Sequence, residues 1–557
     1  MAEAQTAAGK LKMLPIGIED FEKLIRSGYY YVDKTRFIKE LLDNRAEVTL
    51  FLRSRRFGKT LTLSTLQYFF EDTGDEARNA ERRALFAELE IAGAGEEYAL
   101  WQTSRPVIFL TLKSMKQTDY EEDVGMLKEA LSEAFSDHES IIAKLKPRDR
   151  ERFERHAART ASLGCLQAAT GKKSIILIDE YDVPLDGAWL SGYYAKMVAL
   201  IRAFFESGLK TNKNLEFAVI TGCLRVSRES IFTGMNNLKI YSVAANDYGD
   251  SFGFTPNEVD AMLKYFGRTA RRDDIRQWYD GYQIGGFAVY NPWSVVNTLS
   301  DLKNYPEAEP GAYWANSSSN EIVRRLIRQS DETAKAEMET LLSGGAIEKT
   351  IREDLPYQDL EAGGSHLWNF MLFTGYLTMT DKQTEGSHLL CRLRIPNREV
   401  KGIYEDQVKD WFAETLKGED RTPLYDAILR GDAELMSKRI SQLLESTISY
   451  YDYGEAFYHG FLAGILRGMP GYSVKSNRES GLGRADLSLR PVSRKNPYVV
   501  FEFKIAPTIK TMDTACQTAL RQIDRKHYLA EAEEEGYAAV LYYGAAFFKK
   551  EALVMAG

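Results

Sequence analysis

Short apolar runs that alternate with helical stretches most strongly constrain the fold of the first 240 residues. The runs are Val48–Leu52, Val107–Leu112, Ile175–Ile178 and Phe217–Ile220, and polar residues or glycine bound each of them. Buried parallel strands have this continuous apolar character, because helices cover both faces of their sheet. The pattern therefore predicts a parallel α/β sheet with helices on both faces.

The rest of the chain divides into two further regions. Residues 241–447 are mostly helical and are broken by turn signals such as Thr255-Pro256-Asn257. After them the pattern predicts, in this order, a helix, two strands, a helix and a last strand: Gly454–Arg467, Ala485–Leu489, Tyr498–Phe503, Thr511–Glu535 and Ala538–Tyr543. We therefore expect three domains, at residues 1–240, 241–447 and 448–557.

Composition excludes several classes of protein. The 557 residues are 44% hydrophobic and 27% charged, which is enough apolar material for several cores and excludes a disordered chain. The net charge of -8 lacks the basic excess of a bulk nucleic-acid binder, so any contact with nucleic acid has to be local. Four widely spaced cysteines form no CxxC pair, and no apolar run is long enough to span a membrane. We therefore expect a soluble, cytoplasmic protein without a membrane partner.

A phosphate-binding loop is indicated where the first apolar run meets the next helical segment. The run Val48–Leu52 is followed by a loop, by Gly58-Lys59-Thr60 and by the helical segment Leu61–Glu71. In such a loop the backbone N–H groups bind phosphates, the lysine reaches the β- and γ-phosphates and the threonine hydroxyl binds Mg2+. Arg53 stands where the full motif has its first glycine, so this loop departs from the common pattern.

Polar residues at the ends of two later strands support this interpretation. The strand in Ser174–Glu180 ends in Asp179, which we expect to hold Mg2+, and Glu180, which we expect to orient the attacking water. Another strand ends at Thr221, which together with Arg225 would sense and stabilise the γ-phosphate. The alternatives are a buried strand with a solvated acidic end, and a strand terminus followed by a surface arginine.

Near the C-terminus, the two-residue period of a predicted strand places an acidic and a basic side chain on the same face. In Val499–Lys504 the side chains of Glu502 and Lys504 share a face. A hairpin through the turn Arg490–Pro497 would place Asp486 opposite Glu502, and a divalent cation would relieve the repulsion between the carboxylates. Phosphodiester hydrolysis uses such a site, in which carboxylates hold Mg2+ or Mn2+ and the lysine positions water or neutralises charge. The alternative is a cross-strand set of salt bridges on the surface.

Local charge agrees with a nucleic-acid contact at this end of the chain. From Arg467 to Lys504 there are eight basic residues against three acids, two of which are the proposed metal ligands Asp486 and Glu502. Basic residues around a metal centre bind phosphates without reading the base sequence. We therefore expect nucleic acid as a partner, with DNA as the preferred form.

Longer motifs run in order along most of the chain: Leu14–Ile18, Tyr31–Thr35, Arg55–Thr60, Ile178–Asp182, Thr221-Gly222, Phe252–Thr255, Trp278–Tyr282 and Tyr290–Ser294. Together they closely resemble the bacterial and archaeal AAA-ATPase-like P-loop proteins. The resemblance implies that Arg55, Arg56 and Gly58 join Lys59 and Thr60 in binding ATP. That family also lacks the first loop glycine, so Arg53 is no special defect of this chain.

The order of Asp486 and Glu502-x-Lys504 resembles the core of the PD-(D/E)XK nucleases, a domain often found after this ATPase-like module. Glu455 on the preceding helix matches an additional acid of that family, which implies a third metal ligand. Gln522 matches a glutamine on the following helix that lines the site. The resemblances imply an α/β protein with a P-loop NTPase parallel sheet core, a helical middle region and a C-terminal restriction-endonuclease-like domain.

The function implied is that of an ATP-binding, ATP-hydrolysing protein whose Mg2+-dependent nuclease domain cleaves DNA under the control of nucleotide state, in defence or mobile-element biology. One alternative is a nucleotide-dependent signalling or scaffold switch whose nuclease-like domain only binds, and another is an inert P-loop beside a constitutive nuclease. P-loop ATPases often use an arginine from a neighbouring subunit, which leaves a homo-oligomer open. The sequence does not decide between DNA and RNA, between single and double strands, or between internal and terminal cleavage.

Overall fold

The structure is a computed structural model of the whole chain. It describes residues 11–557 except 148–149, 152–162, 225–230, 233–234, 315–331, 353–364, 387, 416–419, 448–454, 481–482, 527, 529–531, 533–534 and 538. The chain forms two compact units, one of Met1–Ser319 with Glu348–Glu399 and one of Asn320–Ile347 with Val400–Gly557. The division into three domains stays a prediction.

The first unit is built on a five-stranded sheet with the strand order β2-β3-β4-β1-β5. Its strands are β1 (Val48–Leu52), β2 (Val107–Thr111), β3 (Ser174–Asp179), β4 (Leu215–Gly222) and β5 (Leu238–Tyr241). Every neighbouring pair is parallel, which confirms the predicted parallel α/β core. The prediction lacked β5, because this short strand alternates polar and apolar residues and gives no continuous apolar run.

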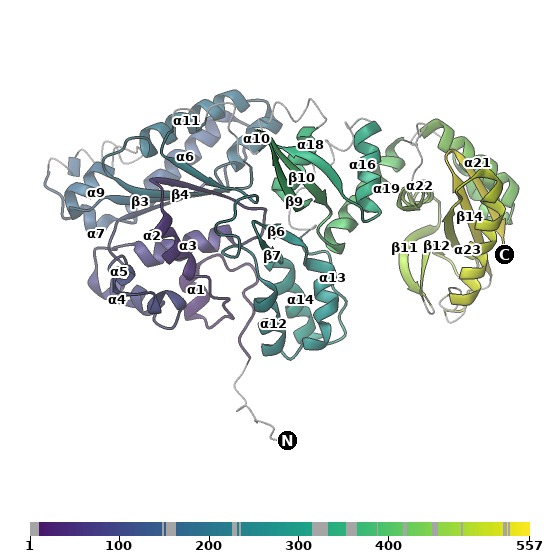
Figure 1. Cartoon of the computed structure of the whole chain (residues 1–557), viewed down its shortest axis with the longest axis horizontal. Coiled ribbons are helices and arrows are strands. Elements are labelled where there is room, and N and C mark those ends of the chain that lie inside the picture. Colours follow the sequence, from purple (N-terminus) through teal and green to yellow (C-terminus); the bar gives the residue numbers. More distant parts are fainter. Residues whose placement is uncertain are drawn as a thin grey trace, which may run out of the picture. The chain divides into compact units, whose positions relative to one another are not determined.

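Helices cover both faces of this sheet. Because successive side chains of a strand point to opposite faces, neighbouring residues of one strand contact different helices. Ile175 and Leu177 of β3 share a hydrophobic cluster with side chains of α2 (Arg36–Asn44) and α3 (Lys59–Phe70). Ile176 and Ile178 face the opposite side, where α6 (Tyr120–Ser136), α9 (Leu163–Thr170) and α11 (Tyr194–Leu209) lie. Figure 1 shows α6 and α11 on one side of the sheet and α2 and α3 on the other.

Two helices after the sheet begin at positions that the local sequence determines. Thr255 caps α12 (Pro256–Tyr265) in a capping box with Glu258. Asn291 caps α14 (Pro292–Asn304) by accepting a hydrogen bond from the N–H of Ser294. Side chains of these two helices, of α13 (Arg272–Tyr279) and of Leu14 form one hydrophobic cluster, which ties the N-terminal segment to the helices.

The middle of the chain is helical, as predicted, but it also contains strands that the prediction missed. β6 (Tyr282–Ile284) and β7 (Phe287–Val289) form a hairpin, and β8 (Ile347–Ile351), β9 (Thr378–Glu385) and β10 (His388–Arg394) form a sheet of order β8-β10-β9. Polar residues interrupt the apolar runs of β9 and β10, so their sequences lack the signal of a buried strand. The remaining α-helices of this unit are α1 (Phe21–Arg26), α4 (Glu76–Ala84), α5 (Glu96–Ala99), α7 (Glu139–Ile142), α10 (Val183–Ser191) and α18 (Ser365–Thr374).

The second unit contains a mixed five-stranded sheet with the strands in sequence order. The strands are β11 (Tyr472–Ser480), β12 (Gly483–Pro491), β13 (Tyr498–Ile505), β14 (Val540–Phe548) and β15 (Glu551–Ala556). Only β13 and β14 pair in parallel, and the other neighbours are antiparallel. The three central strands agree with the predicted ones, whereas the two edge strands were not predicted.

The described α-helices of this unit are α16 (Glu332–Leu342), α19 (Arg398–Thr415), α20 (Thr422–Arg430), α21 (Ala433–Thr447), α22 (Glu455–Leu466) and α23 (Met512–Lys526). The core contains side chains of α20, α21 and α22 together with those of β12, β13 and β14. The hydroxyl groups of Ser437 and Ser441 on α21 accept hydrogen bonds from the edge strand β15, from Val554 N at 2.8 Å and Ala552 N at 2.9 Å. The helix thus satisfies an edge that would otherwise be open to pairing.

Candidate functional site

The loop between β1 and α3 has the backbone of an anion-binding site. Gly58 precedes the first residue of α3 with a φ of +85°, in the left-handed region that glycine adopts without strain. Arg56 also has a positive φ, of +67°. Lys59 and Thr60 follow in the first turn of α3, where backbone N–H groups have no partner within the helix and attract anions. The predicted loop residues therefore lie at a helix N-terminus that suits phosphate.

Arg53, in the place of the missing glycine, has a structural function that the sequence did not reveal. Its side chain is fully buried and donates hydrogen bonds to the carbonyl oxygens of Leu52, Tyr241, Ser242 and Tyr248 at 2.9–3.0 Å. Burial lowers the pKa of Arg53 to about 9, which leaves the guanidinium charged at neutral pH. The side chain thus joins the start of the loop to β5 and to the segment that follows it.

The side chain of Lys59 lies inside the loop and contacts the backbone at the start of the loop. Its Nζ donates to the carbonyl oxygens of Arg53 and Ser54 at 3.1 Å and lies 3.4 Å from the Sγ of Cys223. Burial opposes the charge on Lys59, but the surrounding acidic groups, Cys223 and Glu180 among them, raise its pKa overall. The lysine is therefore a charged group held at the centre of the loop.

Asp179 joins the ends of two strands and the start of α3. One carboxylate oxygen accepts a hydrogen bond from the hydroxyl of Thr60 at 2.6 Å, and the other accepts one from the hydroxyl of Thr221 at 2.7 Å. The N–H of Glu180 lies 3.5 Å from the same Thr221 hydroxyl. Burial raises the pKa of Asp179, and the two hydroxyl donors oppose that shift. The structure thus brings together Thr60, Asp179, Glu180 and Thr221, which sequence reasoning had selected separately.

Two acids beside Asp179 add to this site. Glu180 has a φ of +53°, a strained conformation for a residue other than glycine, and it lines the cavity described below. Asp182 was not predicted as a site residue, although it ends one of the motifs that carried the resemblance. Its buried carboxylate accepts hydrogen bonds from the N–H groups of Cys223 and Leu224 at 2.8 and 3.0 Å, and burial raises its pKa. Asp182 therefore holds the chain in place directly after β4.

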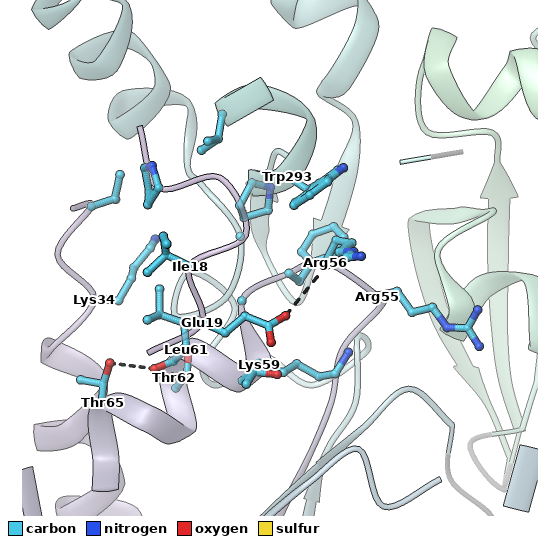
Figure 2. A pocket seen from close by; sticks show the side chains of 18 of the residues that line it. Ile18, Glu19, Lys34, Arg55, Arg56, Lys59, Leu61, Thr62, Thr65 and Trp293 are labelled. Carbon is cyan, nitrogen blue, oxygen red and sulfur yellow. Dashed lines mark hydrogen bonds and ion pairs between the residues drawn. The ribbon is translucent and has the colours of Figure 1, made fainter. Parts of the chain in front are cut away.

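A cavity of about 440 Å3 opens beside the loop, and Lys59, Thr60 and Glu180 line it. Figure 2 shows Lys59 among the side chains around this cavity. Arg55 lies 3.2 Å from Asp186. Arg56 lies over the ring of Trp293 at 4.4 Å and approaches Glu19 at 3.9 Å, and Figure 2 shows the Glu19 and Arg56 side chains pointing toward each other. All eight of these side chains line the same cavity. Arg225 lies outside the described residues.

The second site lies on the paired strands β12 and β13. Their paired register runs from Leu489 with Val499 to Leu487 with Phe501, and Asp486 and Glu502 are the next residues of the two strands. A carboxylate oxygen of Asp486 accepts a hydrogen bond from the N–H of Phe503 at 2.8 Å. The Nε2–H of His459 donates to the carbonyl oxygen of Asp486 at 2.7 Å. This hydrogen bond joins α22 to the backbone of β12 at Asp486.

Glu502 and Lys504 share one side of β13, as the strand period predicts. The Glu502 side chain is 1% exposed, and the Nζ of Lys504 lies 3.1 Å from its Oε1. The same ammonium donates to the carbonyl oxygen of Phe503 at 2.8 Å. Gln522 on α23 donates to the hydroxyl of Tyr528 at 3.3 Å. Glu455 is the first residue of α22, and its side chain lies outside the described part of the structure.

The oxygen donors of this second site suit a small, hard cation. Among the described residues, no group of three or more histidine, cysteine, aspartate or glutamate side chains is placed to hold a metal ion. Asp486 and Glu502 supply a pair of carboxylates, and Mg2+ commonly binds to one or two carboxylates together with water and substrate phosphate. The described residues therefore fit Mg2+ better than a metal that needs a complete protein cage.

Family models match the two regions of the chain that contain these sites. Residues 15–232 match the family model described as a predicted AAA-ATPase, and residues 453–556 match that of the PD-(D/E)XK nuclease superfamily. The chain carries an AAA-ATPase-like domain and a PD-(D/E)XK nuclease domain. It is also 28% identical over 541 residues to an uncharacterized protein in the vnfD 5' region of Azotobacter chroococcum mcd 1, with 94% of each chain covered.

One of the basic residues that the sequence indicated for phosphate binding in the PD-(D/E)XK domain is held by other groups of the protein. Arg490, one of the eight, forms an ion pair with Glu535 at 2.6 Å and also donates to the hydroxyl of Tyr537. The side chains of Arg478 and Arg484 lie outside the described residues. The local positive charge is therefore partly neutralised by an acid from a later segment.

None of the described helices is both long and apolar enough to cross a bilayer.

Proposed function

We propose that this protein is a nucleotide-controlled nuclease, which binds and hydrolyses ATP in its AAA-ATPase-like domain and cleaves phosphodiester bonds of DNA in its PD-(D/E)XK domain. One observation carries the nuclease part: Asp486 and Glu502 lie on paired strands, and the ammonium of Lys504 is 3.1 Å from the buried Glu502. A base beside two acids on a sheet suits catalysis better than a surface salt bridge, because the exposed fraction of Glu502 is only 1%.

The residues of the nuclease site have distinct tasks in this proposal. Asp486 and Glu502, with Glu455 from α22, would hold Mg2+ or Mn2+, which when bound supplies charge neutralisation and an activated water. Lys504 has three N–H donors and uses two of them on Glu502 and on the carbonyl of Phe503. In this proposal the ammonium of Lys504 directs a hydrogen bond to a phosphate oxygen or to the attacking water. Gln522 would line the substrate side.

The ATPase part rests on the group around Asp179. Lys59 and the backbone of the loop would bind the β- and γ-phosphates, and Thr60 and Asp179 would hold Mg2+. Glu180 would orient the attacking water, and Thr221 would report the presence of the γ-phosphate through its hydrogen bond to Asp179. Arg55 and Arg56 supply positive charge at the same cavity, with Arg225 as the further arginine that the sequence suggests.

Control of cleavage by ATP would follow from a shift between domain arrangements. A contact inside the first unit supports this step: the carbonyl oxygen of Phe57, in the phosphate loop, accepts a hydrogen bond from the N–H of Gly253 at 3.3 Å. Gly253 lies three residues before α12. Through this contact, a change in the loop on phosphate binding would be passed to the helical region.

We also propose that the protein acts in the cytoplasm, in defence or mobile-element biology. Three of its cysteines, Cys223, Cys391 and Cys516, are buried free thiols, as is usual in a reducing compartment.

The test is a cleavage assay on circular and linear double-stranded DNA, single-stranded DNA and RNA, with Mg2+ or Mn2+ and with or without ATP. We expect cleavage of DNA that EDTA abolishes and that is lost in Asp486→Ala and Lys504→Ala. Lys510→Ala serves as the matched control, because Lys510 is exposed and lies six residues beyond Lys504. Lys59→Ala should remove the response to ATP.

Two outcomes contradict the proposal. Metal-dependent DNA cleavage that persists in Asp486→Ala shows that the nuclease site is elsewhere or that the activity is a contaminant. ATP turnover without cleavage of any of these nucleic acids favours a nucleotide-dependent switch whose nuclease-like domain only binds.

A further inference from the structure

Glu399 is a buried acidic residue that belongs to neither of the two sites. It is only 2% exposed, and it does not line the cavity beside the phosphate loop. One oxygen of its carboxyl group accepts a hydrogen bond from the backbone N–H of Trp314 at 2.7 Å, and the other accepts one from the hydroxyl of Ser294 at 2.7 Å. A buried carboxyl group that loses such donors stays desolvated at a cost in free energy. The two donors therefore hold Glu399 in one position.

The first of these donors, Trp314, also contacts the phosphate loop. The Nε1–H of its indole ring donates a hydrogen bond to the carbonyl oxygen of Arg55 at 3.2 Å. The ring is buried and packs edge-on against the ring of Tyr376, with the two centroids 5.0 Å apart. Trp314 thus binds the loop through its side chain and Glu399 through its backbone.

The second donor, Ser294, lies in the first turn of α14 and is fully buried. The residue before it, Trp293, lines the cavity, and the guanidinium of Arg56 lies over the ring of Trp293 at 4.4 Å. One donor of Glu399 is therefore bonded to the phosphate loop, and the other adjoins a residue that the loop contacts.

Glu399 also stands where the chain passes from the first compact unit to the second. The helix α19 contains Arg398 and Glu399, which belong to the first unit, and continues from Val400 in the second. Because hydrogen bonds join each turn of a helix to the next, a displacement of its first turn displaces the turns that follow. The second unit also contains Asp486 and Glu502.

We propose that Trp314 and Glu399 are positioning residues that pass the nucleotide state of the phosphate loop to α19, and through this helix to the unit that contains the nuclease site. The inference rests on the proposed function, since it needs a nucleotide at the loop. A shift of the Arg55 carbonyl on phosphate binding changes its bond with Trp314, and the buried carboxyl group of Glu399 follows. The contact between Phe57 and Gly253 stays within the first unit, whereas this one reaches the residue at which the chain leaves it.

The experiment measures amide hydrogen exchange at the start of α19 in the full-length protein, with and without ATP and Mg2+, together with the Kd of ATP. In the wild type we expect ATP to change the exchange rates of residues 400–406 by about fivefold or more, as a typical coupling between sites does. Trp314→Phe removes the indole N–H and keeps an aromatic ring. It should still bind ATP, but ATP should change these exchange rates by less than about twofold. The effect of ATP on the rate of DNA cleavage should be lost in parallel.

Trp101→Phe is the matched control. Trp101 lies in the same unit, its ring packs against the guanidinium groups of Arg45 and Arg105, and it does not line the cavity. This variant should keep the full response to ATP. Ser294→Ala is a second test variant, which removes the other donor of Glu399 and should also reduce the response. Exchange is measured without cleavage, so a protein that binds ATP and cleaves no nucleic acid still tests the coupling.

Three outcomes overturn the inference. Wild-type protein that binds ATP with no change in exchange at α19 shows that nothing is passed to the helix, while the nucleotide site of the proposed function stands. A full response in a Trp314→Phe variant that binds ATP shows that Trp314 does not carry the coupling; if this variant loses ATP binding, a full response in Ser294→Ala overturns the role of Glu399. Wild-type protein that does not bind ATP overturns the proposed nucleotide site itself, and the inference with it.

Discussion

The hydroxyl of Thr60 lies 2.6 Å from a carboxylate oxygen of Asp179, although 119 residues separate the two in sequence. The hydroxyl of Thr221 holds the other oxygen of the same carboxylate. Three segments thus fix the orientation of one buried acid at the carboxyl ends of β3 and β4. Groups that orient a metal-binding carboxylate affect catalysis almost as strongly as the ligand itself.

We predict that Thr221→Val lowers the rate of ATP hydrolysis about tenfold or more, because Asp179 loses one of its two hydroxyl donors while the side-chain volume is kept. The measurement is a steady-state phosphate-release assay over a range of Mg2+ concentrations. Thr269→Val, at an exposed threonine of the same unit, is the control. Equal rates in Thr221→Val and wild type would show that Thr221 does not support Asp179 in turnover.

Replacing Arg53 with the glycine of the common loop motif should lower the stability of the folded protein. Arg53 satisfies four carbonyl oxygens from inside the core. Arg53→Gly and Arg53→Met should each lower the free energy of unfolding by about 3 kcal/mol, since buried acceptors lose their donors. Denaturant unfolding measures this, with Arg36→Met at an exposed arginine as the comparison. An unchanged midpoint in Arg53→Gly would contradict the structural role.

Glu399 should make stability depend on pH. Burial raises its pKa from 4.5 to about 7, and hydrogen bonds from Trp314 N and the Ser294 hydroxyl only partly offset the burial. The folded state therefore binds the proton more tightly than the unfolded state. The resulting stabilisation is complete below about pH 4.5 and is lost as pH rises through 7.

Glu399→Gln removes this titration, so its stability relative to wild type should rise by about 3 kcal/mol between pH 4.5 and pH 8. Unfolding curves followed by tryptophan fluorescence at several pH values give the difference. Glu385→Gln, at an exposed glutamate, should show no such trend. A difference between Glu399→Gln and wild type that is constant with pH would show that Glu399 titrates normally.

The hydroxyl groups that cover β15 should stabilise the second unit. Ser437→Ala leaves the N–H of Val554 without its acceptor, which should cost about 1–2 kcal/mol. Thermal unfolding and amide exchange of Val554 measure the loss. Ser136→Ala is a matched control, because Ser136 on α6 also bonds to the carbonyl four residues before it but is exposed and has no strand partner in the described structure. Faster exchange confined to β15 is expected, and unchanged exchange there would contradict the role.

Much of both sites could be predicted because their signals are local. Gly58, Lys59 and Thr60 are consecutive in the sequence. Glu502 and Lys504 are two residues apart, so the two-residue period of a strand places both side chains on the same face. Asp486 needed only the register of one hairpin. The roles of Arg53 and Asp182 could not be predicted, because their partners lie on β5 and after β4, and no sequence spacing reports such contacts.

The edges of the fold escaped prediction for a related reason. β5 and β11 lack a continuous apolar run in their own sequences, and their identity as strands depends on a neighbour to pair with. Likewise, the sequence indicated an excess of basic residues around Asp486 for phosphate binding, but Arg490 forms an ion pair with Glu535. Net charge along a chain does not show which charges meet in space.

The sequence by itself determined the parallel core, the phosphate loop after its first strand and the acid–base pair of β13, since these depend on residues close together in the chain. Tertiary structure alone decided that Thr60, Asp179 and Thr221 share hydrogen bonds, and that the missing glycine is a buried arginine joined to β5. It also decided that Trp314 joins the phosphate loop to the buried Glu399. The physical reason is that burial and hydrogen bonding join segments more than a hundred residues apart, and only the packed chain specifies which groups meet.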